Sequence, residues 1–137
     1  MVKLRQEKVD KIADYIPTQK LDSGPEKGKL LVIGWGSTYG SIKTAVAELQ
    51  KEGLAVSHAH LRYIRPFPKN LGHIISNFEQ VLIPELNNGQ LIKIIRDQYF
   101  VDAAGYNKIQ GIPFTRSELT QKMRDMLEEK EQPVPNV

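Results

Sequence analysis

The sequence predicts an α/β domain in which helices cover both faces of a mainly parallel sheet. Short apolar runs recur along the chain, each is followed by apolar residues at helical spacing, and glycine or proline separates the units. Strands that alternate with helices need crossover connections, which place helices on both sides of the sheet. With 137 residues and 40% hydrophobic content, the chain can bury one sizeable core. We therefore expect a single three-layer αβα domain.

The amino-terminal part of the chain is predicted to precede this domain. Apolar residues at helical spacing up to Pro17 predict an amphipathic lead-in helix over residues 1–17. Residues 18–29 are polar, contain two glycines and a proline, and show no periodicity. We expect a linker over residues 18–29 and the globular domain over residues 30–127.

The domain is predicted to open with a strand, a tight loop and a helix. Residues 30–33 form an apolar run typical of a buried strand, and Gly34 ends it. Between residues 42 and 49 the apolar side chains recur at offsets of three, four and seven, and Gly53 closes the segment.

A second strand and helix follow in the same way. Residues 55–64 alternate between apolar and polar and are rich in strand formers, and two prolines then break the pattern. The next helix is predicted from four apolar residues at helical spacing: Leu71, Ile74, Ile75 and Phe78.

The third unit repeats this order. Residues 81–83 form a buried apolar run that ends at a proline. Asn87 or Asn88 can cap the following helix, which is predicted from the apolar face formed by Leu91, Ile94 and Ile95.

The end of the domain is predicted to hold a fourth strand and a last helix. Residues 99–101, Tyr-Phe-Val, favour a strand, and residues 105–111 favour a loop. Thr115 and Glu118 form a capping box, in which each side chain accepts the other residue's free backbone N–H. Residues 128–137 offer little to bury, so we expect a flexible tail there.

Composition excludes several classes of function. The net charge of +3 arises from 19 basic and 16 acidic residues scattered along the chain, so nucleic-acid binding is not indicated. The chain has no cysteine, which excludes disulfides, thiolate metal sites and iron–sulfur ligation by this chain. No apolar run is long enough for a membrane segment or a signal peptide. We expect a cytoplasmic protein with no membrane partner.

The loop after the first strand is the first candidate site. In α/β sheets ligands bind beyond the carboxyl ends of the strands. Glycines permit close backbone approach, hydroxyls donate, and the next helix directs free N–H groups at the loop, which suits an anion. The residues concerned are Gly34, Trp35, Gly36, Ser37, Thr38 and Gly40. The spacing is neither a dinucleotide fingerprint nor a P-loop, so a tight turn with Trp35 packed or at an interface is the competing interpretation.

His58, His60 and Arg62 project from one side of the second strand, because side chains on a strand alternate. Two histidines at this spacing can share a metal ion, but no third ligand lies nearby in the sequence. We assign no metal to this chain. Satisfied polar residues beneath a helix, or a polar face toward a partner domain, are the expected roles.

The turn after the third strand is the last candidate. It places a carboxylate and amides at the carboxyl end of that strand: Glu85, Asn87, Asn88 and Gln90. Active-site residues of α/β folds lie at this position, but no second carboxylate or histidine stands at a fixed short spacing to form an acid/base pair. Helix capping and hydrogen bonding between domains are the expected roles, and no residue is assigned to catalysis.

Four segments, in this order and spacing, carry a resemblance to a known family. They are LLVIGWGSTYG at 30–40, HLRYIRPFP at 60–68, PELNNGQL at 84–91 and GYNKIQGIPF at 105–114. The chain resembles the carboxy-terminal domain of the alpha subunit of 2-oxoacid:ferredoxin oxidoreductases, with the last segment most similar to 2-oxoglutarate enzymes. The resemblance covers residues 30 to about 127.

The resemblance implies a fold like the transketolase carboxy-terminal domain, with a five-stranded mixed sheet. It also implies a whole enzyme that decarboxylates a 2-oxoacid on thiamine diphosphate and Mg²⁺, passes electrons through an iron–sulfur cluster to ferredoxin, and forms an acyl-coenzyme A. In this family the beta subunit holds the diphosphate and magnesium, and the amino-terminal domain of alpha completes the thiamine site. The present sequence matches neither region, so we expect a piece of a longer alpha subunit with no cofactor of its own.

The resemblance therefore implies an interface role. The domain would pack through its polar carboxyl edge on the amino-terminal domain of alpha and on the beta subunit, and would meet ferredoxin only through the complex. One alternative is a free module that binds a small anionic or phosphate ligand at the Gly34–Gly40 loop. Another is a domain of a related thiamine enzyme, such as transketolase, which the GWGST and NNGQL strings disfavour.

Overall fold

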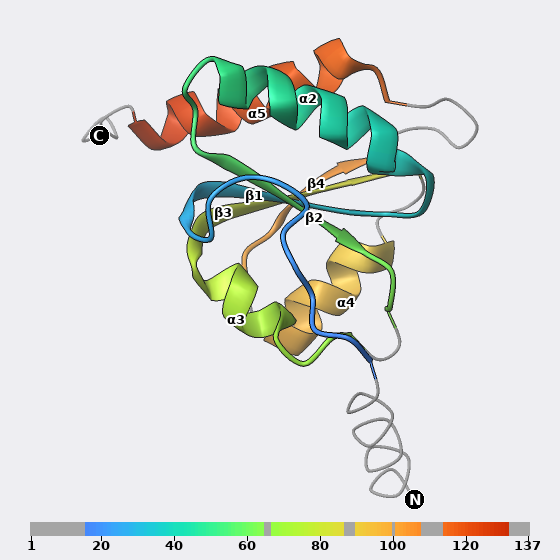
Figure 1. Cartoon of the computed structure of the whole chain (residues 1–137). Helices are drawn as coiled ribbons and strands as arrows, with labels where there is room; N and C mark the ends of the chain where they lie inside the picture. Colours follow the sequence, from blue (N-terminus) through green and yellow to red (C-terminus); the bar gives the residue numbers. More distant parts are fainter. Residues whose placement is uncertain (1–15, 65–66, 87–89, 100, 108–113, 132–137) are drawn as a thin grey trace, which may run out of the picture.

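In the part of the chain that the structure describes, four strands form one parallel sheet through the middle of the molecule (Figure 1). The structure is a computed structural model and describes residues 16–64, 67–86, 90–99, 101–107 and 114–131. The strands are β1 (Gly28–Trp35), β2 (Val56–Leu61), β3 (Phe78–Glu85) and β4 (Ala104–Asn107). They lie in the order β2-β1-β3-β4, so β1 and β3 are central.

Helices cover both faces of this sheet, which confirms the predicted αβα layers. Figure 1 shows α2 (Tyr39–Lys51) and α5 (Arg116–Glu131) on one face, with α3 (Leu71–Ser76) and α4 (Gln90–Tyr99) on the other. α5 begins at the predicted capping box: the Thr115 N–H donates to Glu118 Oε1, and the Glu118 N–H donates to Thr115 Oγ1, both over 3.1 Å. It continues through Glu131, past the expected domain boundary at residue 127.

The core consists of two apolar clusters, one on each face of the sheet. Leu31 and Ile33 of β1 belong to the cluster beneath α3 and α4, while Leu30 and Val32 belong to the cluster beneath α2 and α5. All four side chains are buried. A strand buried on both faces needs apolar residues at every position, which explains why this segment shows no alternation in the sequence.

The expected five-stranded mixed sheet is not what the described residues form, since these contain four strands that all run parallel. Beside β2, at an edge where a further strand could add, Ser23 makes a single antiparallel bridge to His58. The pairing stops there because Gly24 turns the chain with a φ of +93° and Pro25 has no N–H to donate.

The prediction of a fourth strand over residues 99–101 is wrong. Tyr99 is the last residue of α4, and the strand is Ala104–Asn107, in a segment that we expected to be a loop. The Tyr99 ring lies 5.9 Å from the Phe67 ring, and Val101 packs against the same core cluster. The apolar character of these residues therefore anchors the end of a helix, and Phe100 lies outside the described residues.

The sequence pattern also predicts the wrong element for Phe78, on the helix that carries Ile74 and Ile75. α3 ends at Ser76, where the N–H of Asn77 donates to the Ile74 carbonyl, and Phe78 is the first residue of β3. Phe78 is buried because it begins a strand, and its position in the sequence happens to continue the helical spacing of the apolar residues before it.

Residues 17–24, which we call the strap, run along the outer edge of β2; residue 17 was expected to end the lead-in helix, and the others belong to the predicted linker. The Asp22 N–H donates to the His58 carbonyl over 2.7 Å, and the His58 N–H donates to the Ser23 carbonyl over 3.0 Å. Farther along, the Gln19 N–H donates to Asn70 Oδ1 and the Asn70 amide donates to the Gln19 carbonyl. The strap thus covers a sheet edge that would otherwise expose unpaired backbone groups.

Two predicted segments lie largely outside the described residues. Residues 1–15 of the lead-in helix and residues 132–137 of the tail are not described. None of the described helices is both long enough and apolar enough to cross a membrane.

Candidate functional site

The carboxyl ends of β1 and β3 meet at the point where the chain reverses its direction across the sheet. β2 follows β1 on one side and β4 follows β3 on the other, so the connections after β1 and β3 lead apart. Such a switch point is where open α/β sheets bind ligands. A cavity of about 150 Å³ lies there, lined by Trp35, Gly36, Ser37, Thr38, Glu85 and Leu86. We call it the switch-point pocket.

This pocket joins the first and the last of the candidate sites predicted from the sequence. The other predicted residues lie around it without lining it. Gly34 is buried behind the loop, Gly40 is exposed in the first turn of α2, and Gln90 is exposed at the start of α4. Asn87 and Asn88 lie outside the described residues.

Glu85 is buried, with 1% of its surface exposed, and its carboxylate is held by three N–H donors. The Leu91 N–H donates to Oε1 over 2.8 Å and the Ile92 N–H donates to Oε2 over 3.3 Å. The indole N–H of Trp35 donates to Oε1 over 3.3 Å. The carboxylate therefore satisfies the free amino end of α4 and links it to β1.

Contacts within this chain fix the conformation of the loop after β1. Gly36 adopts a φ of +65°, which an L side chain rarely tolerates, and begins a short 3-10 helix, η1 (Gly36–Thr38). The Thr38 hydroxyl donates to the Trp35 carbonyl over 2.9 Å. At Gly34, a Cβ would lie 2.5 Å from Ile42 Cδ1, so the helix packs directly on the strand. These constraints explain Gly34 and Gly36 without a ligand.

His58 and His60 lie beneath α2, as expected, but their ring nitrogens are not satisfied by the described part of the chain. Both nitrogens of His58 and Nδ1 of His60 are buried without a hydrogen-bond partner there. Both rings face Tyr39, with centroids 5.6 and 4.9 Å from it. Burial lowers the pKa of His58 to about 4, against the opposing charge of Asp22, so this ring is neutral at pH 7.

His60 shares this environment. Burial lowers its pKa too, again against Asp22, whose Oδ1 accepts the His60 backbone N–H over 2.8 Å. Within the described residues, no group of three or more His, Cys, Asp or Glu side chains could hold a metal ion. The pair is therefore a buried, uncharged part of the layer between β2 and α2.

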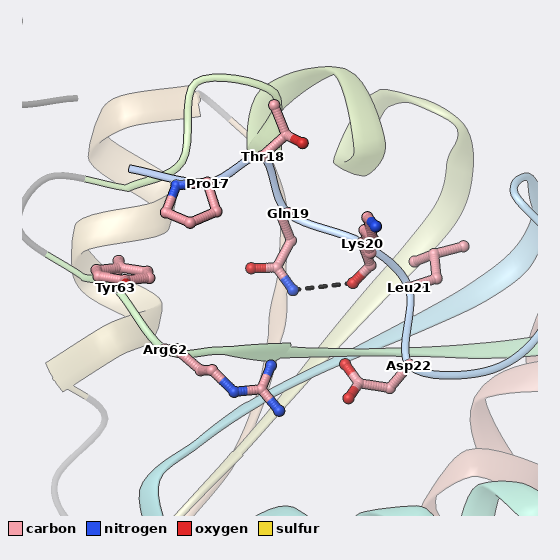
Figure 2. Close-up of a pocket in the computed structure, with 8 residues that line it drawn as sticks. All are labelled: Pro17, Thr18, Gln19, Lys20, Leu21, Asp22, Arg62 and Tyr63. Carbon is pink, nitrogen blue, oxygen red and sulfur yellow. Dashed lines mark hydrogen bonds between the residues drawn. The ribbon is translucent and has the colours of Figure 1, made fainter. Parts of the chain in front are cut away.

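A second hollow lies at the carboxyl end of β2, and sequence reasoning missed it. Its volume is about 320 Å³, and Figure 2 shows the strap on one side and the end of β2 on the other. We call it the β2 hollow; it is lined by Pro17, Thr18, Gln19, Lys20, Leu21, Asp22, Arg62 and Tyr63. Its two walls are some forty residues apart in the sequence, so no local pattern could have joined them.

The chemistry of this edge suits contact better than catalysis. At about 150 Å³, the switch-point pocket is smaller than the roughly 300–1,000 Å³ of typical cofactor or small-molecule sites. It can take one side chain or an anion of phosphate size. Its single carboxylate, Glu85, already accepts three N–H groups of the same chain.

Comparison with known proteins identifies the family. The family model described as pyruvate:ferredoxin oxidoreductase core domain II matches residues 28–119. The 2-oxoglutarate oxidoreductase subunit KorA of Mycobacterium tuberculosis is 42% identical over 127 residues, which cover 93% of this chain and 19% of that protein. The chain thus spans about a fifth of the length of this relative.

Solved structures show the same fold. The 2-oxoglutarate:ferredoxin oxidoreductase from Magnetococcus marinus, determined with 2-oxoglutarate, coenzyme A and succinyl-CoA bound, superposes with a TM-score of 0.79 at 24% identity, covering 86% of this chain and 21% of that one. A split-gene transketolase, an inactive beta4 tetramer, superposes with a TM-score of 0.61 at 13% identity, covering 80% and 41%. The fold is therefore like that of the transketolase carboxy-terminal domain, and the chain belongs to the core domain II family found in alpha subunits of 2-oxoacid:ferredoxin oxidoreductases.

Proposed function

We propose that this domain is a non-catalytic interface domain of the alpha subunit of a 2-oxoacid:ferredoxin oxidoreductase, with 2-oxoglutarate as the 2-oxoacid. One observation carries the proposal. The carboxylate at the switch point, Glu85, holds the amino end of α4 and the indole of Trp35. A carboxylate held in this way fixes the structure of the carboxyl edge, whereas a general acid or base must be able to reach the reacting atoms.

Neither thiamine diphosphate nor an iron–sulfur cluster suits the switch-point pocket. Thiamine diphosphate with Mg²⁺ needs a larger cavity than this pocket of about 150 Å³. Among the described residues, no group of three or more His, Cys, Asp or Glu side chains could hold a metal ion. An iron–sulfur cluster needs cysteine, and the chain has none. We propose that thiamine diphosphate, Mg²⁺, the cluster and coenzyme A bind elsewhere in the complex.

The proposed partners are the amino-terminal domain of the same alpha subunit and the beta subunit, with ferredoxin reached through the complex. The relatives support this assignment, because the chain covers only 19% and 21% of the two oxidoreductase chains compared above. The size and lining of the switch-point pocket support it as well, since the pocket can accept a side chain from a neighbouring domain.

A second candidate is a free module that binds a small anion at the Gly34–Gly40 loop. One observation favours it: α2 has no acidic residue in its first turn, and Thr38, at its N-cap, makes no side-chain cap bond. The positive end of this helix is therefore not neutralised by those side chains. Calorimetry with inorganic phosphate tests this candidate, and a phosphate-dependent heat that Ser37→Glu abolishes would favour it.

The proposal is tested with the chain and the purified remaining parts of the oxidoreductase. Alone, the chain is expected to fold but to show neither 2-oxoacid-dependent ferredoxin reduction nor heat on addition of thiamine diphosphate and Mg²⁺. Ser37→Arg, which fills the mouth of the switch-point pocket, is expected to weaken association by about tenfold or more. Ala47→Arg, on the exposed face of α2, is the matched control. Tight binding of thiamine diphosphate to the isolated chain would overturn the proposal.

A further inference from the structure

The β2 hollow has an exposed aromatic ring beside two exposed cationic side chains. Tyr63 is 45% exposed and is the one exposed large hydrophobic side chain among the described residues. Arg62 and Lys20 are exposed as well, and neither side chain makes a hydrogen bond or ion pair within the described part of the chain. The single carboxylate of the lining belongs to Asp22, whose Oδ1 accepts the His60 N–H. The lining therefore carries an excess of positive charge.

The walls of the hollow are fixed by hydrogen bonds of the domain itself. Gln19 exchanges two bonds of 2.7 and 2.8 Å with the Asn70 side chain. Its own amide donates to the carbonyls of Lys20 and His60 over 2.9 and 3.0 Å (Figure 2 shows the first). The walls of the hollow are thus ordered before a partner binds, so binding there costs the domain little conformational entropy.

The end of β2 that lines the hollow also lies beside the strand end that lines the switch-point pocket. Trp35, which lines that pocket, is the register partner of Leu61, and Arg62 follows Leu61 directly. The two features are therefore neighbours along one edge of the sheet, built from the ends of adjacent strands.

We propose that the β2 hollow docks an acidic segment of the neighbouring part of the oxidoreductase, with a carboxylate on Arg62 and Lys20 and an apolar side chain on Tyr63. This inference rests on the proposed function. Arginine and tyrosine are the residue types that dominate binding energy at protein interfaces, and a guanidinium pairs with a carboxylate through two parallel bonds.

A protein segment fits the hollow better than a free small molecule. Small-molecule sites bury most of their ligand, but Pro17, Thr18, Lys20, Asp22, Arg62 and Tyr63 are all exposed and form an open rim. An open, rigid, cationic surface with a projecting ring is typical of a site completed by a partner's own surface.

The first experiment measures association of the chain with the purified remaining parts of the oxidoreductase by calorimetry. Arg62→Glu and Tyr63→Ala are each expected to weaken binding by about tenfold or more, and Arg62→Glu is also expected to reduce its salt dependence. Lys93→Glu, an equal charge reversal on the exposed face of α4, is the control and is expected to leave binding unchanged. Arg62→Gln, which removes the charge and keeps most of the stem, serves if the reversal lowers the melting temperature.

The result separates this inference from the proposed function. If Ser37→Arg weakens association and Arg62→Glu behaves like Lys93→Glu, the hollow is not a docking site and the interface role stands. If neither Ser37→Arg nor Arg62→Glu has an effect, both proposals fail. An Arg62-dependent heat with succinate or inorganic phosphate and the isolated chain would make the hollow a small-anion site and overturn the docking proposal.

The second experiment identifies the partner chemistry. A photo-crosslinking phenylalanine at position 63 is expected to capture a peptide of the neighbouring domain that contains Asp or Glu. Changing that acid to Lys is expected to weaken wild-type association and to restore binding to Arg62→Glu. A captured peptide without an acidic residue, or a swap that restores nothing, would overturn the assignment of an acidic segment.

Discussion

His58 shows how a buried side chain ties the stability of this fold to pH. Both of its ring nitrogens are buried without a partner in the described chain, and Tyr39 and Lys43 of α2 and Asp22 of the strap face the pair of histidines. Burial outweighs the attraction of Asp22, so the pKa falls from 6.5 to about 4 in the folded state. Between these values the unfolded chain binds more protons than the folded one.

We therefore predict that the free energy of unfolding has its full value above about pH 6.5 and decreases as the pH drops toward 4. For His58 this decrease is at most about 3 kcal/mol. His60 adds a loss of the same sign. His58→Leu is expected to flatten the fall in melting temperature between pH 7 and pH 4.5, whereas His73→Gln, at an exposed position on α3, leaves it unchanged. Equal pH profiles for His58→Leu and the wild type would contradict this origin.

Glu85 holds together three backbone and side-chain donors, and its removal leaves all three unpaired in a buried place. We predict that Glu85→Ala costs about 2–3 kcal/mol in the free energy of unfolding. Urea denaturation followed by the fluorescence of Trp35, the single tryptophan, measures this change. Glu79→Ala, on an exposed position of the same strand, is the matched control, and equal stability of the two variants would refute the role of Glu85.

At the residue scale the sequence was informative wherever the chemistry is local. The capping box of Thr115 and Glu118 was predicted because its partners lie three residues apart, and both bonds are present. The bond between Trp35 and Glu85 could not be predicted, since fifty residues separate the two. The sequence could not predict either that the ring nitrogens of His58 lack hydrogen-bond partners in the described chain, because the hydrogen bonding of a buried group depends on the whole surrounding layer.

At the scale of elements, apolar patterns located most strands and helices but not their limits. The apolar runs correctly predict β1 and β3, whereas the same kind of pattern wrongly predicts a strand over residues 99–101 and a helical position for Phe78. Both errors arise because a short apolar run is compatible with either structure until its neighbours are known. The strap escaped detection for another reason: its bonds to β2 and α3 use backbone groups and amides, which leave no apolar pattern.

The strap itself is open to a direct test. Asn70→Ala removes both hydrogen bonds to the Gln19 main chain, and we predict a loss of about 1–3 kcal/mol in stability. We also expect faster tryptic cleavage after Lys20, because the strap then opens more often. Gln121→Ala, which removes an exposed amide on α5, is the control. Unchanged cleavage in Asn70→Ala would show that the other strap bonds suffice.

At the scale of the whole molecule, the order of strands follows from a few rules, yet the assembly does not. Parallel pairing and helices on both faces were predictable from the alternation of strands and helices. Which strands lie at the edges of the sheet was not predictable. The two edges differ, because the strap covers β2 whereas β4 pairs with β3 over only four residues. The role of the carboxyl edge is inferred from the family, because a pocket of about 150 Å³ alone is compatible with either a side chain or an anion.

The sheet is also expected to be unequal in stability from its centre to its far edge. β1 is paired on both sides and its residues Leu30–Ile33 are buried on both faces, whereas Gly105 and Asn107 of β4 are exposed. Backbone bonds that open only on global unfolding exchange their hydrogens slowest, and those near an exposed edge open locally. We therefore predict that hydrogen exchange followed by NMR finds the slowest amides in β1 and β3 and clearly faster exchange in β4. Exchange in β4 as slow as in β1 would show that the sheet opens as one unit, and the β4 edge would then be no weaker than the core.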